Sequence, residues 1–420
     1  MVRTIPWLMT GSGYDACVRC GLCLPVCPTY LETLTETSGP RGRIALIKSV
    51  DRGELDLLSP GFVHQMSECL DCRACEAACP SAVPYGELLE GMRARIEVAH
   101  EPSRPPAERL RRRVLLEWLF ARPARLRAIA RLLRFAQRTG LDRLAGLFGL
   151  REAAAIAPRI PEAFFVANGQ RYAVSHAEGT AMLHAGCVMS AAFASVHEAT
   201  IRMLNRARLS VVVPAAQGCC GALAVHAGEN RFARELAKIN IAAFEASGAG
   251  VYVVNAAGCG AALKEYGRLL ADEPAWQARA EAFSSRVRDV IEVLDAMELP
   301  QAPVRIERSV TYQEPCHLVH AQRVSVAPRR LLAKIPGLRL VEMRESAVCC
   351  GSAGIYNLTQ PEMAERLGRR KVQNIERTGA EIVVTANPGC ALQIGAGLRV
   401  SGSVARIVHL VELLDQAYSA

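Results

Sequence analysis

One stretch decides the fold of the N-terminal part of this chain: Cys17-Val-Arg-Cys20-Gly-Leu-Cys23-Leu-Pro-Val-Cys27-Pro28. The same spacing returns in Cys69-Leu-Asp-Cys72-Arg-Ala-Cys75-Glu-Ala-Ala-Cys79-Pro80. Three cysteines on one tight turn can meet three irons of a single [4Fe–4S] cube, while the cysteine before proline points toward another cube. The two runs therefore predict two [4Fe–4S] clusters that exchange their fourth ligands.

The exchange defines two ligand sets. Cluster 1 is expected to use Cys17, Cys20, Cys23 and Cys79, and cluster 2 to use Cys69, Cys72, Cys75 and Cys27. A zinc site or disulfides are the alternatives. Zinc sites generally use separated Cys-x-x-Cys pairs, which do not explain a triplet followed by Cys-Pro.

The spacer between the two runs, residues 28–68, is long for a compact ferredoxin, and its apolar residues have helical periodicity. Residues 1–100 are therefore expected to form an α-helical ferredoxin domain. Arg41 and Arg43 lie in this spacer. They either raise the reduction potential of a nearby negatively charged cluster or begin a solvated helix, and the sequence leaves both interpretations open.

Cysteine usage bears on the compartment. The 420 residues include 16 cysteines, and half of the chain is apolar. No signal peptide and no run of 18 apolar residues is recognisable. We therefore expect a cytoplasmic protein whose clustered thiols are metal ligands. The net charge of +9 is modest for this length and does not indicate a nucleic-acid partner.

Residues 166–420 contain a tandem duplication. Matching cysteines recur at offsets of 129 (Cys187 and Cys316), 130 (Cys219 and Cys349) and 131 residues (Cys259 and Cys390). Short β-branched runs precede these cysteines, so each is expected to follow the carboxyl end of a strand in an α/β unit, where ligands gather. The units are predicted to span residues 166–300 and 301–420.

Each copy offers four thiols, enough for a further cluster, although buried free cysteines that pack as small hydrophobic residues are the alternative. The candidate ligands are Cys187, Cys219, Cys220, Cys259, Cys316, Cys349, Cys350 and Cys390. Four histidines lie near these cysteines in the sequence: His184, His226, His317 and His320. Each is predicted to be structural rather than a ligand or a quinone contact.

The segment 101–165 is an arginine-rich linker that is expected to be helical. Its basic helix, with Trp118, Phe120 and leucines at helical spacing, either lies peripherally on an anionic membrane or packs against protein. Packing is favoured, because Pro123 divides the segment.

Several phrases resemble the glycolate oxidase (glycolate dehydrogenase) iron–sulfur subunit family. They include the sequence from Gly39 to Ile44 (GPRGRI), that from Cys349 to Tyr356 (CCGSAGIY) and that from Thr385 to Cys390 (TANPGC). The resemblance implies that FAD-binding flavoprotein partners oxidise glycolate to glyoxylate. This subunit would then relay electrons to the respiratory quinone pool or another acceptor. Related iron–sulfur subunits of lactate and anaerobic glycerol-3-phosphate dehydrogenases share the ferredoxin motifs and are the alternative.

The duplicated region resembles the CCG domains of heterodisulfide reductases. Their fuller motif ends in Cys-x-x-Cys, whereas Ala262 and Gln393 stand where each last cysteine would be. A thiol–disulfide enzyme is thus disfavoured. The predicted fold is a multidomain α+β arrangement, an α-helical ferredoxin domain followed by a duplicated α/β CCG region.

Sequence features for catalysis by this chain alone are lacking. No G-x-G-x-x-G follows a predicted strand, and no serine elbow or paired carboxylates stand out. The chain is therefore expected to act only as the non-flavin subunit of an oxidoreductase complex. A stand-alone ferredoxin would not need 255 further residues with eight more cysteines.

Overall fold

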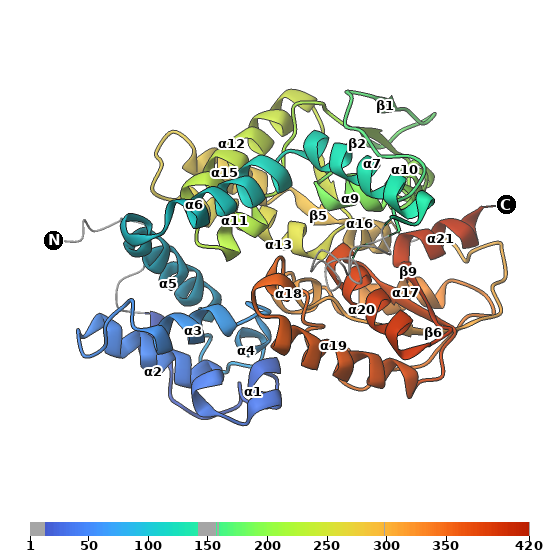
Figure 1. The fold of residues 1–420 in the computed structure, drawn as a ribbon. Helices are drawn as coiled ribbons and strands as arrows, with labels where there is room; N and C mark the ends of the chain where they lie inside the picture. Colours follow the sequence, from blue (N-terminus) through green and yellow to red (C-terminus); the bar gives the residue numbers. More distant parts are fainter. Residues whose placement is uncertain (1–12, 142–156, 158, 298, 420) are drawn as a thin grey trace.

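The computed structural model describes residues 13–141, 157, 159–297 and 299–419. Figure 1 shows three parts: a helical N-terminal domain in blue, and two α/β units in green to yellow and in orange to red. The N-terminal domain contains η1 (Gly13–Ala16), α1 (Pro28–Thr33), η2 (Glu36–Ser38), α2 (Pro40–Asp51), α3 (Pro60–Glu68), α4 (Ala74–Ala77) and α5 (Tyr85–His100). Both motifs lie in this domain, and the expected helical spacer is present as α1 to α3.

Proline places the start of the spacer helices. Each of α1, α2 and α3 has proline in its first turn, where the fixed φ suits the helix and the missing N–H would be unpaired in any case. The three longest helices, α2, α3 and α5, bury Ile47, Met66 and Leu89 against one another. This small core holds the loops that carry the cysteines.

A helical segment leads from the first domain to the α/β units. It consists of η3 (Glu101–Ser103), α6 (Pro106–Arg113), the π-helical η4 (Val114–Phe120) and α7 (Pro123–Thr139). Pro123 separates η4 from α7, as the sequence predicts. The remainder of the predicted linker, residues 142–156 and 158, lies outside the described residues.

The first α/β unit, here called repeat 1, contains a five-stranded sheet of order β1-β3-β2-β4-β5. Its elements are β1 (Arg171–Tyr172), β2 (Gly179–Leu183), α9 (Val188–Ala192), α10 (Ala194–Arg206), β3 (Leu209–Val212), α11 (Ala222–His226), α12 (Asn230–Ser247), β4 (Val251–Val254), α13 (Ala257–Lys264), α14 (Tyr266–Leu269), α15 (Gln277–Ser284), β5 (Val287–Asp289) and α16 (Val290–Ala296). Strands β2 to β5 are parallel, and β1 adds an antiparallel edge.

The second unit, repeat 2, contains a parallel sheet of order β7-β6-β8-β9. Its elements are β6 (Ser309–Tyr312), η6 (His317–Ala321), α17 (Ala327–Ala333), β7 (Arg339–Leu340), α18 (Tyr356–Thr359), α19 (Pro361–Glu376), β8 (Ile382–Thr385), α20 (Pro388–Ser401), β9 (Arg406–His409) and α21 (Leu410–Tyr418). The strand order repeats that of β3-β2-β4-β5, so the two sheets have the same topology.

The two repeats exchange their last helices. Helix α21 of repeat 2 packs on α10 of repeat 1, and α16 of repeat 1 packs on α17 of repeat 2. Arg202 of α10 also forms a bidentate ion pair with Asp415 of α21. One hydrophobic core runs through both repeats. The two repeats consequently share one core, and the N-terminal domain packs against both of them.

Candidate redox centres

The eight motif thiols line two adjacent cavities in the N-terminal domain. The first is lined by Cys17, Cys20, Cys23, Cys75 and Cys79, and the second by Cys27, Cys69, Cys72 and Cys75. The structure thus brings Cys79 to the first run and Cys27 to the second, as in the crossed sets. Cys75 lies in the wall that the cavities share, so groups held in the two cavities would be neighbours.

The local backbone explains how these turns close around a centre. In the first motif, the second and fourth residues after Cys17 have positive φ (58° at Arg19 and 85° at Gly21). The second motif repeats this at the same positions after Cys69, with 53° at Asp71 and 62° at Arg73. Alternating left-handed residues curl the chain tightly, so that side chains three apart face the same point.

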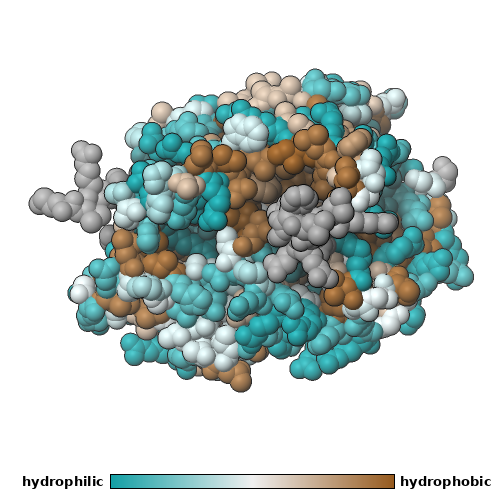
Figure 2. Space-filling view, viewed as in Figure 1, coloured by the Kyte–Doolittle hydropathy of each residue, from teal (hydrophilic) through white to brown (hydrophobic). Residues whose placement is uncertain are grey.

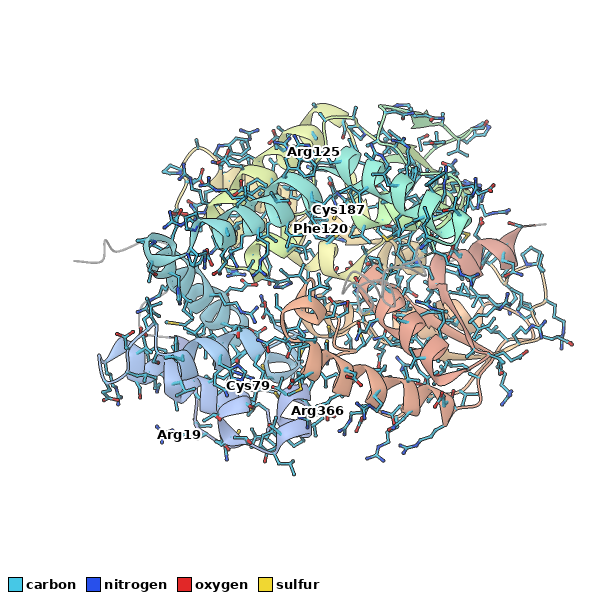
Figure 3. All side chains as sticks on the ribbon, viewed as in Figure 1. Arg19, Cys79, Phe120, Arg125, Cys187 and Arg366 are labelled. Atoms are coloured by element: carbon cyan, nitrogen blue, oxygen red, sulfur yellow. The ribbon has the colours of Figure 1, made fainter. Side chains whose placement is uncertain are left out.

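The two cavities differ in depth. Cys20 is exposed, and Cys17, Cys23 and Cys79 are partly exposed. The thiols of the second set are all buried. Figure 3 shows Arg19, beside Cys20, at the outer edge of the N-terminal domain. The first cavity is therefore the surface site of the pair, and the second is the interior site.

Arg43 is a buried cation beside the interior cavity. Its guanidinium is fully buried, pairs with Glu68 at 2.9 Å and donates to the carbonyl oxygen of Gln65 at 2.8 Å. Burial raises the pKa of the Cys27 thiol, and the charge of Arg43 counteracts this rise. Since Arg43 is buried, the interpretation of a solvated helix start is wrong for this residue. Arg41 lies nearer the surface and pairs with Glu36.

The motif thiols, all of them among the described residues, do not form the close group of ligands that a single zinc ion would bind. A tetrahedral zinc ion with bonds of about 2.3 Å brings its sulfur ligands to about 3.8 Å from one another. Among the described residues, two groups of histidine, cysteine or carboxylate side chains have three ligand atoms within 4.8 Å of one another. They are His184, Cys220 and Cys259, and Asp71, Glu90 and His226, so neither contains a motif thiol.

Each repeat gathers its own four thiols at the carboxyl edge of its sheet. In repeat 2, Cys316 Sγ lies 4.0 Å from Cys349 Sγ, and Cys350 contacts both Cys349 and Cys390. In repeat 1 the thiols form the same chain, from Cys187 through Cys219 and Cys220 to Cys259. The structure thus brings together all the cysteines that the sequence assigned to each copy. Figure 3 places Cys187 in the upper part of the molecule, away from Cys79.

Repeat 2 meets the interior cavity directly. Cys72 shares a buried cluster with Cys349, Tyr356 and Leu367, and Cys316 packs against this cluster. Tyr356 also donates a 2.7 Å hydrogen bond to the carbonyl oxygen of Glu68. The thiols of repeat 2 and those of the interior cavity therefore form one continuous buried region, which the sequence did not predict.

A buried ion network holds the N-terminal domain against repeat 1. Arg73 lies between Asp71 at 3.0 Å and Glu90 at 2.9 Å, and it reaches Glu265 of repeat 1 at 3.3 Å. Arg268 of repeat 1 returns the contact with a 2.6 Å pair to Glu90. This network fixes the second motif, because Asp71 and Arg73 flank Cys72.

All four histidines have a hydrogen-bond partner at one ring nitrogen. His226 Nδ1 lies 3.1 Å from Asp71 and its ring stacks on His317, whose Nε2 lies 3.0 Å from the carbonyl oxygen of Asp71. His320 Nε2 lies 3.1 Å from the carbonyl oxygen of Ala347. His184 differs, because its Nε2 atom is buried without a hydrogen-bond partner.

Comparison with known proteins decides the family. The probable glycolate oxidase iron–sulfur subunit of Bacillus subtilis (strain 168) is 40% identical over 418 residues, which cover 96% of this chain and 93% of that protein. The glycolate oxidase iron–sulfur subunit of Escherichia coli (strain K12) is 33% identical over 412 residues, with the same coverage. This chain belongs to the glycolate oxidase iron–sulfur subunit family. The resemblance inferred from the cysteine phrases is confirmed.

Family models agree with this assignment along the sequence. A 4Fe-4S dicluster domain matches residues 13–83, the linker region of the glycolate oxidase iron–sulfur subunit matches 107–159, and a cysteine-rich domain matches both 181–264 and 310–395. The double match confirms the duplication in this iron–sulfur subunit. The lactate utilization protein A of an Exiguobacterium species is 28% identical, but over 55% of this chain. Within the described residues, no helix has the length and apolar character required to cross a membrane.

Proposed function

We propose that this chain is the electron-relay subunit of a multi-subunit glycolate oxidase and passes electrons one at a time from a flavin on a partner subunit toward a respiratory quinone. The continuous arrangement of thiols from the exposed Cys20 through the interior cavity to repeat 2 carries this proposal. A continuous series of candidate metal ligands suits electron transfer. Among the described residues, no site for a hydroxy acid is recognisable.

The chain's own thiols fit two [4Fe–4S] clusters. Cys17, Cys20, Cys23 and Cys79 would hold the surface cluster, and Cys69, Cys72, Cys75 and Cys27 the interior one. When bound, these clusters supply one-electron chemistry. Arg43 provides positive charge beside the interior thiolates, which favours the more reduced and more negative form of a group held there.

A third group of thiols in repeat 2 has a setting that also suits a metal cluster. Hydrogen bonds from Cys349 and Cys390 and the charge of buried Lys371 lower the pKa of Cys350. Lys371 donates to the carbonyl oxygens of Glu345 and Ser346, at 2.6 and 3.0 Å, and is 2% exposed. The positive charge of Lys371 thus favours the ionised, metal-binding form of Cys350. Electrons would therefore pass from the interior cavity to repeat 2.

The surface cavity is surrounded by exposed apolar side chains that suit a flavoprotein partner. Val18 and Leu22 flank Cys20 and are 69% and 56% exposed. Leu34, on the same domain, is 74% exposed. Burial of such residues around a redox centre gives a partner both affinity and a short distance to the cluster. We assign this face to electron entry from the flavin.

A second exposed apolar face lies on the arginine-rich segment. Trp118, Leu132 and Phe135 are exposed on η4 and α7, and Figure 2 shows apolar side chains gathered there. Arg125 covers the Trp118 ring at 4.7 Å. The mixture of exposed arginines and apolar residues is compatible with both a partner subunit and peripheral contact with an anionic membrane.

The choice of glycolate rests on the coverage of the relatives. Both glycolate oxidase subunits align with almost the whole chain, including the linker, whereas the lactate relative aligns with about half of it. Thiol–disulfide chemistry remains disfavoured, because Ala262 lines a pocket at the position of the missing cysteine and provides no thiol.

The test is reconstitution. The chain, purified without oxygen and with at least eight irons and eight sulfides, should not oxidise glycolate with an artificial acceptor. Addition of its flavoprotein partners should restore glycolate-dependent quinone reduction. Glycolate oxidation by the single chain would refute the relay, and activity of the complex with lactate or glycerol 3-phosphate alone would discard glycolate.

A further inference from the structure

Among the four histidines near the duplicated cysteines, all of them described by the structure, His184 is the one that has a buried ring nitrogen without a hydrogen-bond partner. It follows β2 directly and is 2% exposed. Its Nδ1 lies 2.7 Å from the hydroxyl of Tyr252, while Nε2 has no hydrogen-bond partner. An unpaired polar nitrogen in a protein interior is destabilising unless a ligand satisfies it.

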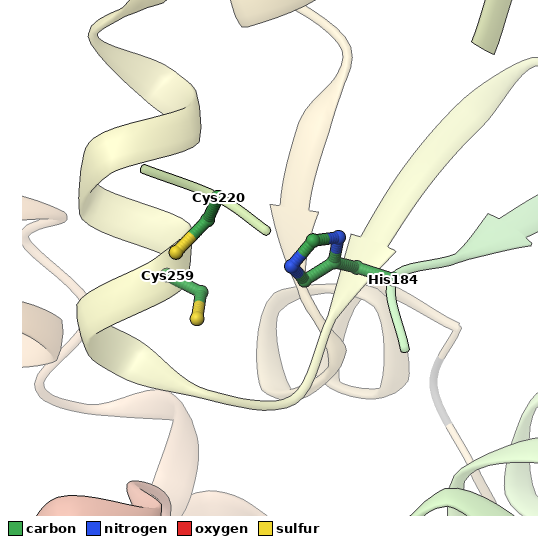
Figure 4. A group of neighbouring side chains, drawn as sticks. All are labelled: His184, Cys220 and Cys259. Atoms are coloured by element: carbon green, nitrogen blue, oxygen red, sulfur yellow. The ribbon is translucent and has the colours of Figure 1, made fainter. Parts of the chain in front are cut away.

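The free nitrogen points toward thiols. His184 Nε2 and the thiols of Cys220 and Cys259 all lie within 4.8 Å of one another. Figure 4 shows the imidazole directed at the space beside these two sulfur atoms. Cys219 contacts Cys220, and Cys187 contacts Cys219, so a further thiol is available next to the group.

The Tyr252 hydroxyl fixes how the imidazole is presented. The tautomer of a metal-binding histidine is set by the hydrogen bond at its other ring nitrogen. A partner at Nδ1 orients the ring and leaves Nε2 as the ligand atom. The Tyr252 hydroxyl is therefore placed to orient the imidazole of His184 with its Nε2 atom facing the thiols.

Repeat 2 lacks both residues. At the offset of 129 that relates Cys187 to Cys316, Gln313 replaces His184. Its amide is satisfied, donating to the carbonyl oxygen of Glu314 and accepting from Thr385, each at 2.7 Å. At the offset of 131 that relates Cys259 to Cys390, Val383 replaces Tyr252.

The two repeats also differ in the charge of a side chain near their thiols. Lys371 of repeat 2 corresponds, at the offset of 131, to Asn240 in repeat 1. Asn240 is neutral and binds the backbone N–H of Gly218 and the carbonyl oxygen of Cys219, at 3.0 and 2.9 Å. Repeat 1 thus replaces a cation by a neutral amide and adds a neutral nitrogen ligand, a set that suits one divalent ion rather than a polyanionic cluster.

We propose that repeat 1 holds a single four-coordinate divalent ion of the zinc class, bound by His184 Nε2, Cys220 and Cys259 and completed by Cys219 or Cys187. Mixed nitrogen and sulfur ligation in a closed, buried site is typical of structural zinc. Zinc has no redox chemistry, so the two repeats have different tasks. Repeat 1 stabilises the fold, and repeat 2 lies on the electron path.

Metal analysis of the whole chain tests this site. Protein produced with iron and zinc and dialysed against a weak chelator should retain one zinc per chain. His184→Ala and Cys220→Ser should each lower bound zinc at least about tenfold, and Tyr252→Phe should weaken zinc affinity about 10- to 100-fold. His320→Ala and Cys350→Ser are matched controls from repeat 2 and should leave the zinc content unchanged.

Cobalt gives a readout that a folding defect does not imitate. The chain loaded with Co²⁺ should show thiolate-to-cobalt charge transfer and tetrahedral d–d bands, and His184→Gln should shift the d–d bands while circular dichroism stays unchanged. Retention of zinc by His184→Ala, or loss of iron and acid-labile sulfide from Cys220→Ser in place of zinc, would overturn the proposal. Neither result depends on glycolate oxidation, so the relay is tested separately.

Discussion

Cys72 of the N-terminal domain and Cys349 of repeat 2 lie in the same buried hydrophobic cluster. Burial raises the pKa of the Cys72 thiol, and the nearby Cys316 thiol raises it further. The interior cavity thus meets the thiols of repeat 2. Among the described residues, no thiol of repeat 1 belongs to this cluster. In the proposed relay, this contact would direct electrons from the interior cavity to repeat 2.

The path predicts that the two repeats respond differently to the same substitution. Cys349→Ser should slow electron transfer from the N-terminal clusters to quinone at least about tenfold, or about 1.4 kcal/mol of barrier. Cys219→Ser, its counterpart in repeat 1, should leave this rate within about twofold. Stopped-flow reoxidation of the reduced complex by a quinone measures both. Equal losses in the two variants would contradict a path through repeat 2.

The crossed ligand sets make a second prediction. Cys79→Ser should alter the surface cluster held by the first run, and Cys27→Ser should alter the interior cluster, because each thiol lines the cavity of the other motif. Cluster-resolved EPR of the two reduced variants distinguishes the centres. If each substitution changes the cluster of its own run, the crossed assignment is wrong.

A charge introduced on the face proposed for electron entry should weaken binding of the flavoprotein partner. Leu22→Glu should weaken binding of the flavoprotein partner by about 1.5–3 kcal/mol, since it would bury a carboxylate in place of an apolar side chain. Val404→Glu is the matched control, because Val404 is 95% exposed and lies in repeat 2. Calorimetric titration of the partner into each variant gives the comparison. Equal affinities would remove this face from the interface.

The buried carboxyl of Asp289 should make the free energy of unfolding depend on pH. Burial raises its pKa to about 7 from 3.8, while it caps α16 by accepting from the backbone N–H of Ile291 at 3.0 Å. A folded-state pKa above the unfolded value gives stability that is present below pH 4 and is lost as pH rises through 7. Asp289→Asn keeps an acceptor for the cap but does not titrate.

We therefore expect the unfolding free energy of Asp289→Asn to rise relative to the parent by on the order of 2–3 kcal/mol between pH 5 and pH 8. Denaturation of the two proteins at both pH values, in parallel, measures the change. A difference that is the same at pH 5 and pH 8 would show that the buried carboxyl has an ordinary pKa.

The helical periodicity of the spacer predicted the helical first domain, and the β-branched runs before the repeated cysteines predicted the duplicated α/β units, because metal ligands and strand ends impose fixed positions along a chain. The cysteine spacing also identified which thiols would gather. The spacing did not reveal that Arg43 is buried, since a short arginine-containing phrase looks the same at a solvated helix start.

Two features of the site depend on tertiary packing and had only weak sequence signals. The contact between Cys72 and repeat 2 follows from how the N-terminal domain lies on the repeats, which no local pattern encodes. The special status of His184 could have been found by aligning the two copies, because Gln313 and Val383 stand where repeat 1 has His184 and Tyr252. The sequence predicts the same structural role for all four histidines. Only the hydrogen-bond partners in the structure distinguish His184 from the other three.

The measurement that tests the relay most directly separates flavin reduction from quinone reduction in the assembled complex. Cys72→Ala removes a thiol that lines the interior cavity and that contacts repeat 2. Stopped-flow mixing with glycolate should still bleach the partner flavin at the parent rate, while steady-state quinone reduction falls to background. Quinone reduction at the parent rate by this variant would contradict the account, because electrons would then bypass the thiols of this chain.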